Sequence, residues 1–310
     1  MSGQLVPFPG GQGRKKPKAA PHPVARSVGG MMRFHRKQRG WSQADAVAAV
    51  PVMGSVPTLS KYETGAAKQD PAKVTEFLLA CGAPDWVIEE AERSLRRIDN
   101  SPAWAKSSDV VEEPLAGLFA WEAASKVIRT YQESGIPGML QTRGYAKALM
   151  IDFTRNQPNP DRKRILESLV ARRLEVRLQR QSLLEEDDAP VFEAMIAESV
   201  LAMEVGGRMV FREQLRHLFS LAENRPDIHV RIVPRSAGAA VHPSIMLLKP
   251  HDDSVGRAVY LETRNRSGEL LVDVDDVEMY QAALDDLWGR ALSKEESMQT
   301  IDRYIEYLAD

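Results

Sequence analysis

The side chains best suited to chemistry cluster between residues 55 and 68, and they are hydroxyl and ammonium groups. Such groups donate hydrogen bonds to phosphate oxygens, which positions a protein on DNA without reading its sequence. Between them lie methyl and ring carbons that suit a thymine methyl better than a guanine edge. Lys61 is the best candidate for a base or phosphate hydrogen bond. The candidate nucleic-acid contacts are Ser55, Val56, Pro57, Thr58, Ser60, Lys61 and Lys68.

The distribution of charge points to the same end of the chain. Residues 1–68 hold 11 basic and 2 acidic side chains, a net charge of +9, whereas the other 242 residues carry −11. A basic N-terminal part followed by an acidic remainder indicates that a polyanionic partner binds the N-terminal part alone. The alternative is a solvated basic tail with no partner.

Signatures of common enzymes are missing from the sequence. It contains no phosphate-binding loop, no Gly-x-Ser-x-Gly elbow and no His-Glu-x-x-His motif. The acidic cluster of Asp273, Asp275, Asp276 and Glu278 lacks the glycine and the spacing of a calcium loop. We therefore predict no catalytic residue, cofactor or metal, although six histidines leave room for an undetected site.

Cellular location can be inferred from what the chain lacks. Cys81 is the single cysteine, so no disulfide can form within one chain. No apolar stretch of about 18 residues and no signal peptide are evident. We expect a cytoplasmic protein, associated with the nucleoid if it binds DNA.

Helix start and stop signals divide the chain into three parts. Residues 1–24 are rich in proline, glycine and basic residues and should be disordered. Residues 25–100 should form a helical domain, with short helices at 31–39, 42–50 and 55–64 and longer ones at 71–80 and 84–98. Ser42 with Asp45 predicts a capped helix start, and Pro51 should end that helix.

Residues 101–310 should form an α+β domain, because helical and alternating patterns are mixed there. The expected strands are 126–132, 191–196, 229–233, 244–248 and 258–262, and the expected helices are 142–152, 161–185, 211–224, 275–291 and 293–308. We interpret the arginines at 172–180 as a solvated helix face. The fold class is thus a mainly α N-terminal domain followed by an α+β domain.

The three short helices resemble the helix-turn-helix of the xenobiotic-response-element (XRE, repressor and Cro-like) family. The resemblance is carried by Arg36, Gly40-Trp41-Ser42-Gln43, Leu59-Ser60-Lys61-Tyr62-Glu63 and Gly65. It implies that Gln43 contacts the DNA backbone and that Glu63 pairs with Arg36. Gln43 and Glu63 are two residues further apart than in the family, and Pro51-Val52 looks like the insertion. His35 stands where the family has leucine, and we expect it to be partly buried.

Residues 104–308 resemble the C-terminal domain of WhiJ-type actinobacterial regulators, a domain of unknown function. The resemblance is carried by Glu122-Ala123-Ala124-Ser125, Ile128-Arg129-Thr130-Tyr131, Ile136-Pro137-Gly138-Met139-Leu140-Gln141-Thr142 and Tyr260-Leu261-Glu262. It implies a small partner protein, in an arrangement likened to toxin–antitoxin systems. Glu122, Arg129, Tyr131 and Gln141 are candidates for binding that partner or a ligand, or else pair within the fold.

We therefore expect a sequence-specific transcriptional regulator that binds double-stranded DNA as a homodimer through helix 55–64. Its C-terminal domain would bind a small protein or ligand. One alternative is an antitoxin-like protein that sequesters a small partner, with DNA binding secondary. A helical interaction module without DNA binding, or an enzyme domain fused to a DNA reader, are further alternatives.

Overall fold

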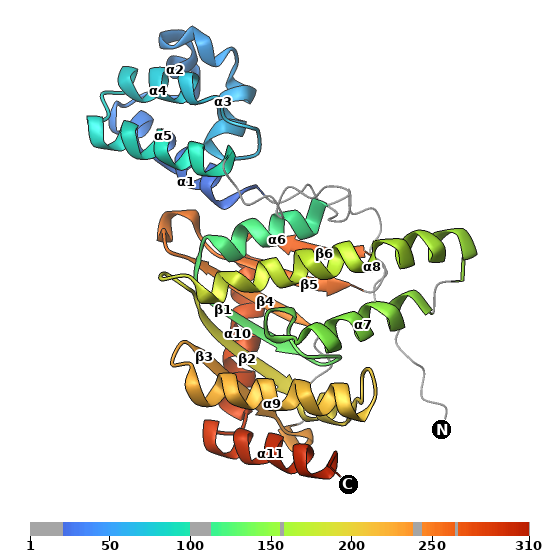
Figure 1. Cartoon of the computed structure of the whole chain (residues 1–310). Coiled ribbons are helices and arrows are strands. Elements are labelled where there is room, and N and C mark those ends of the chain that lie inside the picture. The colour runs from blue at the N-terminus through green and yellow to red at the C-terminus, as the bar shows by residue number, and fades with distance from the viewer. Residues whose placement is uncertain (1–20, 100–112, 156–157, 238–243, 264–265, 310) are drawn as a thin grey trace, which may run out of the picture.

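The computed structural model describes residues 21–99, 113–155, 158–237, 244–263 and 266–309, which form a helical N-terminal region and a larger sheet-containing region (Figure 1). This confirms the predicted fold class. Residues 1–20 of the tail predicted at 1–24, and the predicted domain boundary between residues 100 and 101, lie outside the described residues. Pro23 and Val24, placed in the tail by the prediction, are helical instead, because His22 and Pro23 supply a helix start.

The N-terminal region contains five α-helices and one short 3₁₀-helix among the described residues. They are α1 (Pro23–Gln38), α2 (Gln43–Ala49), η1 (Pro51–Met53), α3 (Val56–Glu63), α4 (Pro71–Ala80) and α5 (Asp85–Asp99). The capping box predicted for α2 is present, since the Ser42 and Asp45 side chains bond each other's backbone N–H. Gly40 and Gly65 adopt positive φ after α1 and α3, as glycines at helix C-termini often do.

One apolar core holds these helices together. Val28 and Met32 of α1 meet Leu59 of α3, and Phe77 and Leu78 of α4 complete the centre. Cys81 is buried in the same core, and burial raises the pKa of its thiol to about 11. A thiol of this kind behaves as a small apolar side chain rather than as a nucleophile.

The C-terminal region is built on a six-stranded sheet with the order β3-β2-β1-β4-β5-β6. Strands β1, β2 and β3 are parallel, whereas β4, β5 and β6 are antiparallel. The strands are β1 (Ser125–Gln132), β2 (Val191–Ala197), β3 (Ile228–Val233), β4 (Ile245–Pro250), β5 (Ala258–Thr263) and β6 (Arg266–Leu271).

Helices cover both faces of this sheet. One face carries α6 (Glu113–Ala123), α7 (Arg143–Arg155), α8 (Pro160–Gln181), α9 (Arg208–Asn224) and α11 (Lys294–Tyr307), which share a large core with alternate strand residues. The other face carries α10 (Val274–Arg290), whose Leu284 and Leu287 pack on Leu247 and Val259. No described helix has the length and apolarity needed to cross a membrane.

Two elements were not predicted from the sequence. Helix α6 carries apolar residues on all sides, so its pattern shows little helical periodicity. Strand β6 pairs with β5 and contains Gly268, where an added Cβ would lie 2.2 Å from the Tyr260 ring. Helix α1 is also longer than the predicted 31–39, because Gly29 and Gly30 lie inside it.

Helix α1 contacts the sheet-containing region through its first turns. The Ser27 hydroxyl donates to the Asp252 carboxylate, and the Arg26 guanidinium lies 5.7 Å from the centroid of the Trp121 ring. The Trp121 indole N–H donates to the Pro21 carbonyl at 3.2 Å. The N-terminal helices are therefore anchored on α6 and on the segment after β4.

Candidate nucleic-acid interface

Helix α3 presents its first residues and Lys61 to solvent. Ser55, Val56, Pro57 and Lys61 are exposed, while Leu59 and Tyr62 face the core. The helix packs against α1, α2 and η1, and Figure 1 shows it away from the sheet. Thr58 is half-buried and its hydroxyl bonds to that of Ser55 at 2.9 Å, whereas Lys61 is exposed in the last turn. The exposed predicted contacts thus lie along one accessible side of a helix, as entry into a major groove requires.

The predicted pair of Arg36 and Glu63 locks this helix to α1. Arg36 Nε donates to Glu63 Oε1 at 2.5 Å and its Nη2 donates to Oε2 at 2.9 Å, with the two side chains 9% and 2% exposed. This is a buried bidentate pair. Hydrogen bonding to Glu63 raises the pKa of Arg36 above its ordinary value. Arg36 Nη1 also donates to the Trp41 carbonyl at 2.8 Å, which joins the turn before α2 to the pair.

The Gln43 side chain has a partner inside the protein. Its Nε2 donates to Glu63 Oε2 at 2.9 Å, so the amide completes the buried Arg36–Glu63 network. Gln43 is half-buried at the first position of α2. Its contact with a DNA backbone stays a prediction, and in the free protein its amide orients Glu63.

The turn between α2 and α3 is lengthened by the 3₁₀-helix η1. Met53 of η1 is fully buried, and Gly54 adopts a φ of 77° before Ser55 caps α3. The Ser55 hydroxyl accepts from the Thr58 N–H at 3.3 Å. The two residues that exceed the usual spacing therefore lie in a folded turn and leave α3 intact.

The remaining predicted contacts lie around α3. Ser60 is half-buried, and its carbonyl accepts from the Thr64 hydroxyl at 2.9 Å. Lys68 is exposed just beyond the helix. Sequence reasoning missed three exposed basic residues at the end of α1, which are Arg33, Lys37 and Arg39. Their signal was the run of basic residues in 33–39, and Arg33 Nη2 donates to the Glu63 carbonyl at 3.0 Å, beside α3.

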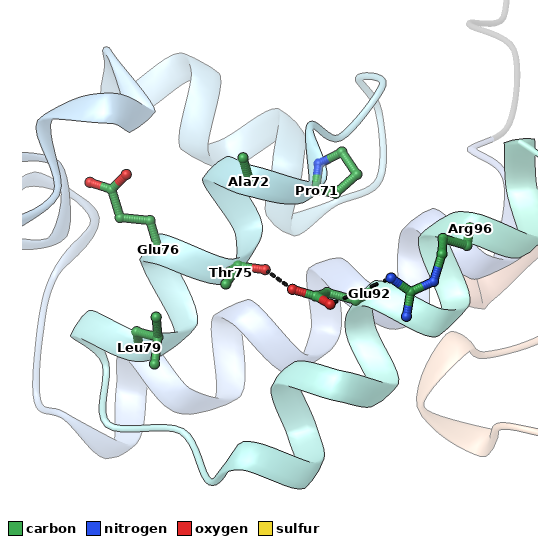
Figure 2. Close-up of a pocket in the computed structure, with 7 residues that line it drawn as sticks. All are labelled: Pro71, Ala72, Thr75, Glu76, Leu79, Glu92 and Arg96. Carbon is green, nitrogen blue, oxygen red and sulfur yellow. Dashed lines mark hydrogen bonds and ion pairs between the residues drawn. The ribbon is translucent and has the colours of Figure 1, made fainter.

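A shallow pocket in the N-terminal region lies away from α3. Figure 2 shows it between α4 and α5, lined by Pro71, Ala72, Thr75, Glu76, Leu79, Glu92 and Arg96. The Thr75 hydroxyl donates to Glu92 at 2.8 Å, and Arg96 lies 3.5 Å from the same carboxylate. Its central polar groups are thus paired, and the pocket contains none of the predicted contacts.

The sheet separates the four candidates predicted for the C-terminal domain. Arg129 and Tyr131 point to the α10 face, where Arg129 pairs with Glu193 and Asp285. Glu122 lies on the opposite side and accepts from Arg180 Nε at 2.6 Å. The four residues therefore do not form one pocket: Arg129 and Tyr131, two positions apart on β1, share one face of the sheet, whereas Glu122 belongs to a helix that covers the other face.

Gln141 and the arginines of α8 lie together on the α6 and α8 side. Gln141 Oε1 accepts from Arg177 Nη1 at 2.7 Å. Arg180 is buried, and Arg173 and Arg177 are half-buried, so interpreting residues 172–180 as a solvated face was wrong for these three. Arg180 turns inward because Glu122, far away in the sequence, neutralises it. Arg172, in contrast, is exposed.

Acidic clusters do not form a metal centre in the described part of the chain. There, no three His, Cys, Asp or Glu side chains come close enough to hold a metal ion. Asp273 instead caps α10, and its carboxylate accepts from the Asp275 N–H at 3.1 Å.

Comparisons with known proteins identify the C-terminal region. Residues 115–303 match the family model described as Domain of unknown function (DUF5753). No curated protein and no solved structure matches the chain. The family match leaves out α1 to α5, so the helix-turn-helix resemblance stays a prediction. Since the match covers more than half of its residues, the chain belongs to the DUF5753 family.

Proposed function

We propose that this protein is a sequence-specific DNA-binding transcriptional regulator whose DUF5753 domain binds a small partner protein or ligand. The observation that carries the proposal is α3, with exposed Val56, Pro57 and Lys61 and with the buried Arg36–Glu63 pair behind it. A rigid exposed helix is what major-groove reading needs.

The charges around α3 support the same proposal. Arg33, Lys37, Arg39, Lys61 and Lys68 are all exposed on α1, on α3 and in the turns that follow them. Together they can contact phosphates on both sides of a groove, which gives affinity that falls steeply with salt. A single α3 reads one half-site, so we further propose a homodimer on two half-sites about 34–36 Å apart.

Fluorescence anisotropy with DNA from the promoter of its own gene and of neighbouring genes tests the proposal. Specific binding should persist with competitor DNA and weaken as salt increases. Lys61→Glu should weaken it about tenfold or more, since losing a specific contact costs about 1–3 kcal/mol.

Lys294→Glu is the matched control, because it makes the same charge change at an exposed position at the start of α11. It should leave DNA affinity unchanged. Equal losses in the two variants would show a nonspecific charge effect, and no specific binding on any of these promoters would refute the proposal.

A further inference from the structure

A second cluster of polar residues lies between α8 and the segment that follows β1. The loop residues Ile136–Gln141 are tied to α8, since Gln181 Nε2 donates to the carbonyls of Gly138 at 2.9 Å and of Gln141 at 2.8 Å. Gln141 Nε2 donates in turn to the Ile136 carbonyl at 2.7 Å. These bonds fix the Gln141 side chain so that its oxygen faces Arg177.

Arg180 is neutralised in this cluster. Its Nε and Nη2 donate to the two Glu122 oxygens at 2.6 and 2.5 Å, and its guanidinium lies 5.0 Å from the Phe119 ring centroid. Burial raises the pKa of Glu122, and the Arg180 charge opposes that effect. Both oxygens of the Glu122 carboxylate therefore accept hydrogen bonds from Arg180.

Arg177 is not neutralised in the same way. Within the described residues, its guanidinium makes one hydrogen bond, to the neutral Gln141 side chain, and no carboxylate lies within 4.0 Å. Glu262 acts on it through its electrostatic field and is itself exposed. Glu122 thus neutralises Arg180, whereas the positive charge of Arg177 is opposed only by the field of the exposed Glu262.

Burying part of a charged group favours the binding of an oppositely charged partner. A guanidinium has five N–H donors, and one of those of Arg177 is bonded. Burial, and then the neighbouring Arg180 charge, lower the pKa of Arg177 to about 10. Arg177 is half-buried, and none of its nitrogen atoms is among the described buried atoms that lack a hydrogen-bond partner, so its remaining donors reach solvent.

We infer that Arg177 is the centre of a binding site for the oxyanion group, carboxylate or phosphate, of a small ligand of the DUF5753 domain. A planar guanidinium donates two parallel hydrogen bonds to such a group. Gln141 holds Arg177 in position, and Arg180 adds a second positive field. This inference rests on the proposed ligand-binding role of the domain and does not require DNA binding.

The site lies next to the contact between the two regions. Glu122, which holds Arg180, directly follows Trp121 in α6, and Trp121 lies under Arg26 of α1. A ligand at Arg177 would therefore act beside the helix to which α3 is locked.

Thermal unfolding of the full chain without DNA tests the inference, with sodium acetate and sodium phosphate compared against sodium chloride at matched ionic strength. At roughly ten times its dissociation constant, a bound anion should raise Tm by about 3–6 °C. A rise with acetate identifies a carboxylate site and a rise with phosphate a phosphate site. Either supports the inference, whereas no rise above chloride overturns it.

Variants separate this site from general salt effects, since phosphate stabilises many proteins by exclusion from their surface. Arg177→Gln should lose the anion-dependent rise, and Arg164→Gln, an exposed arginine on the same helix, should keep it. An equal rise in R177Q and R164Q overturns the inference.

If R177Q does not fold, Arg177→Lys replaces it. That variant keeps the charge but lacks the planar fork, so its apparent anion affinity should fall about tenfold. Unchanged affinity would overturn the inference. Because DNA is absent, neither result depends on the outcome of the DNA-binding experiment.

Discussion

Replacing Glu63 by alanine tests how α3 is held against α1. The substitution removes both acceptors of the Arg36 fork, at 2.5 and 2.9 Å, and the acceptor of Gln43 at 2.9 Å. It leaves the Arg36 guanidinium buried without its countercharge. Breaking one partner of a buried pair costs about 3–5 kcal/mol.

The expected loss is large for a small helical region. For a unit of about 60–100 residues, 1 kcal/mol corresponds to about 4–8 °C in Tm, so Glu63→Ala should lower the transition of the N-terminal helices by roughly 12 °C or more. Differential scanning calorimetry of the full chain measures it, and the transition of the DUF5753 region should change little.

A double-mutant cycle shows whether the effect belongs to the pair. Arg36→Met combined with Glu63→Ala should restore part of the stability, because the uncompensated buried charge is gone. As a control, Arg93→Ala removes an exposed ion pair with Glu90 and should cost about 1 kcal/mol or less. An unchanged melting temperature for Glu63→Ala would refute the reasoning.

Two further predictions concern Gly29, which lies inside α1, and His22, which precedes it. Gly29→Ala should cost about 1–3 kcal/mol in thermal unfolding, because its Cβ would lie 2.5 Å from the Tyr62 carbonyl oxygen, whereas Gly289→Ala, with open space in α10, should be neutral or stabilising. Burial lowers the pKa of His22 from 6.5 to about 4. The unfolded chain therefore binds a proton at a higher pH than the folded chain does. As a result, the free energy of unfolding should fall by at most about 3 kcal/mol as pH drops from 6.5 to 4. His22→Gln should remove this part of the pH profile in urea unfolding, and a profile identical to wild type would contradict the assignment.

Local features were predictable from the sequence because their physical causes are local. The Ser42–Asp45 capping box, the proline stop at Pro51 and the alternation in β1 depend on residues a few positions apart. The helices of the N-terminal region were therefore placed to within a few residues, except for the start of α1. The Arg36–Glu63 pair was also foreseen, through the family resemblance of the residues around it.

Tertiary structure alone decided which distant residues meet. Glu122 and Arg180 lie 58 residues apart, and only the packing of α6 beside α8 brings them into one buried pair. The sheet places Arg129 and Tyr131 on the face opposite Glu122 and Gln141, so the four candidate residues cannot bind one small ligand together. Burying a charge is costly unless a partner arrives from elsewhere in the chain, and that partner cannot be read from local pattern. For the same reason, the sequence did not single out Arg177 as a site residue. Its charge has no such partner among the described residues, and only the structure shows this.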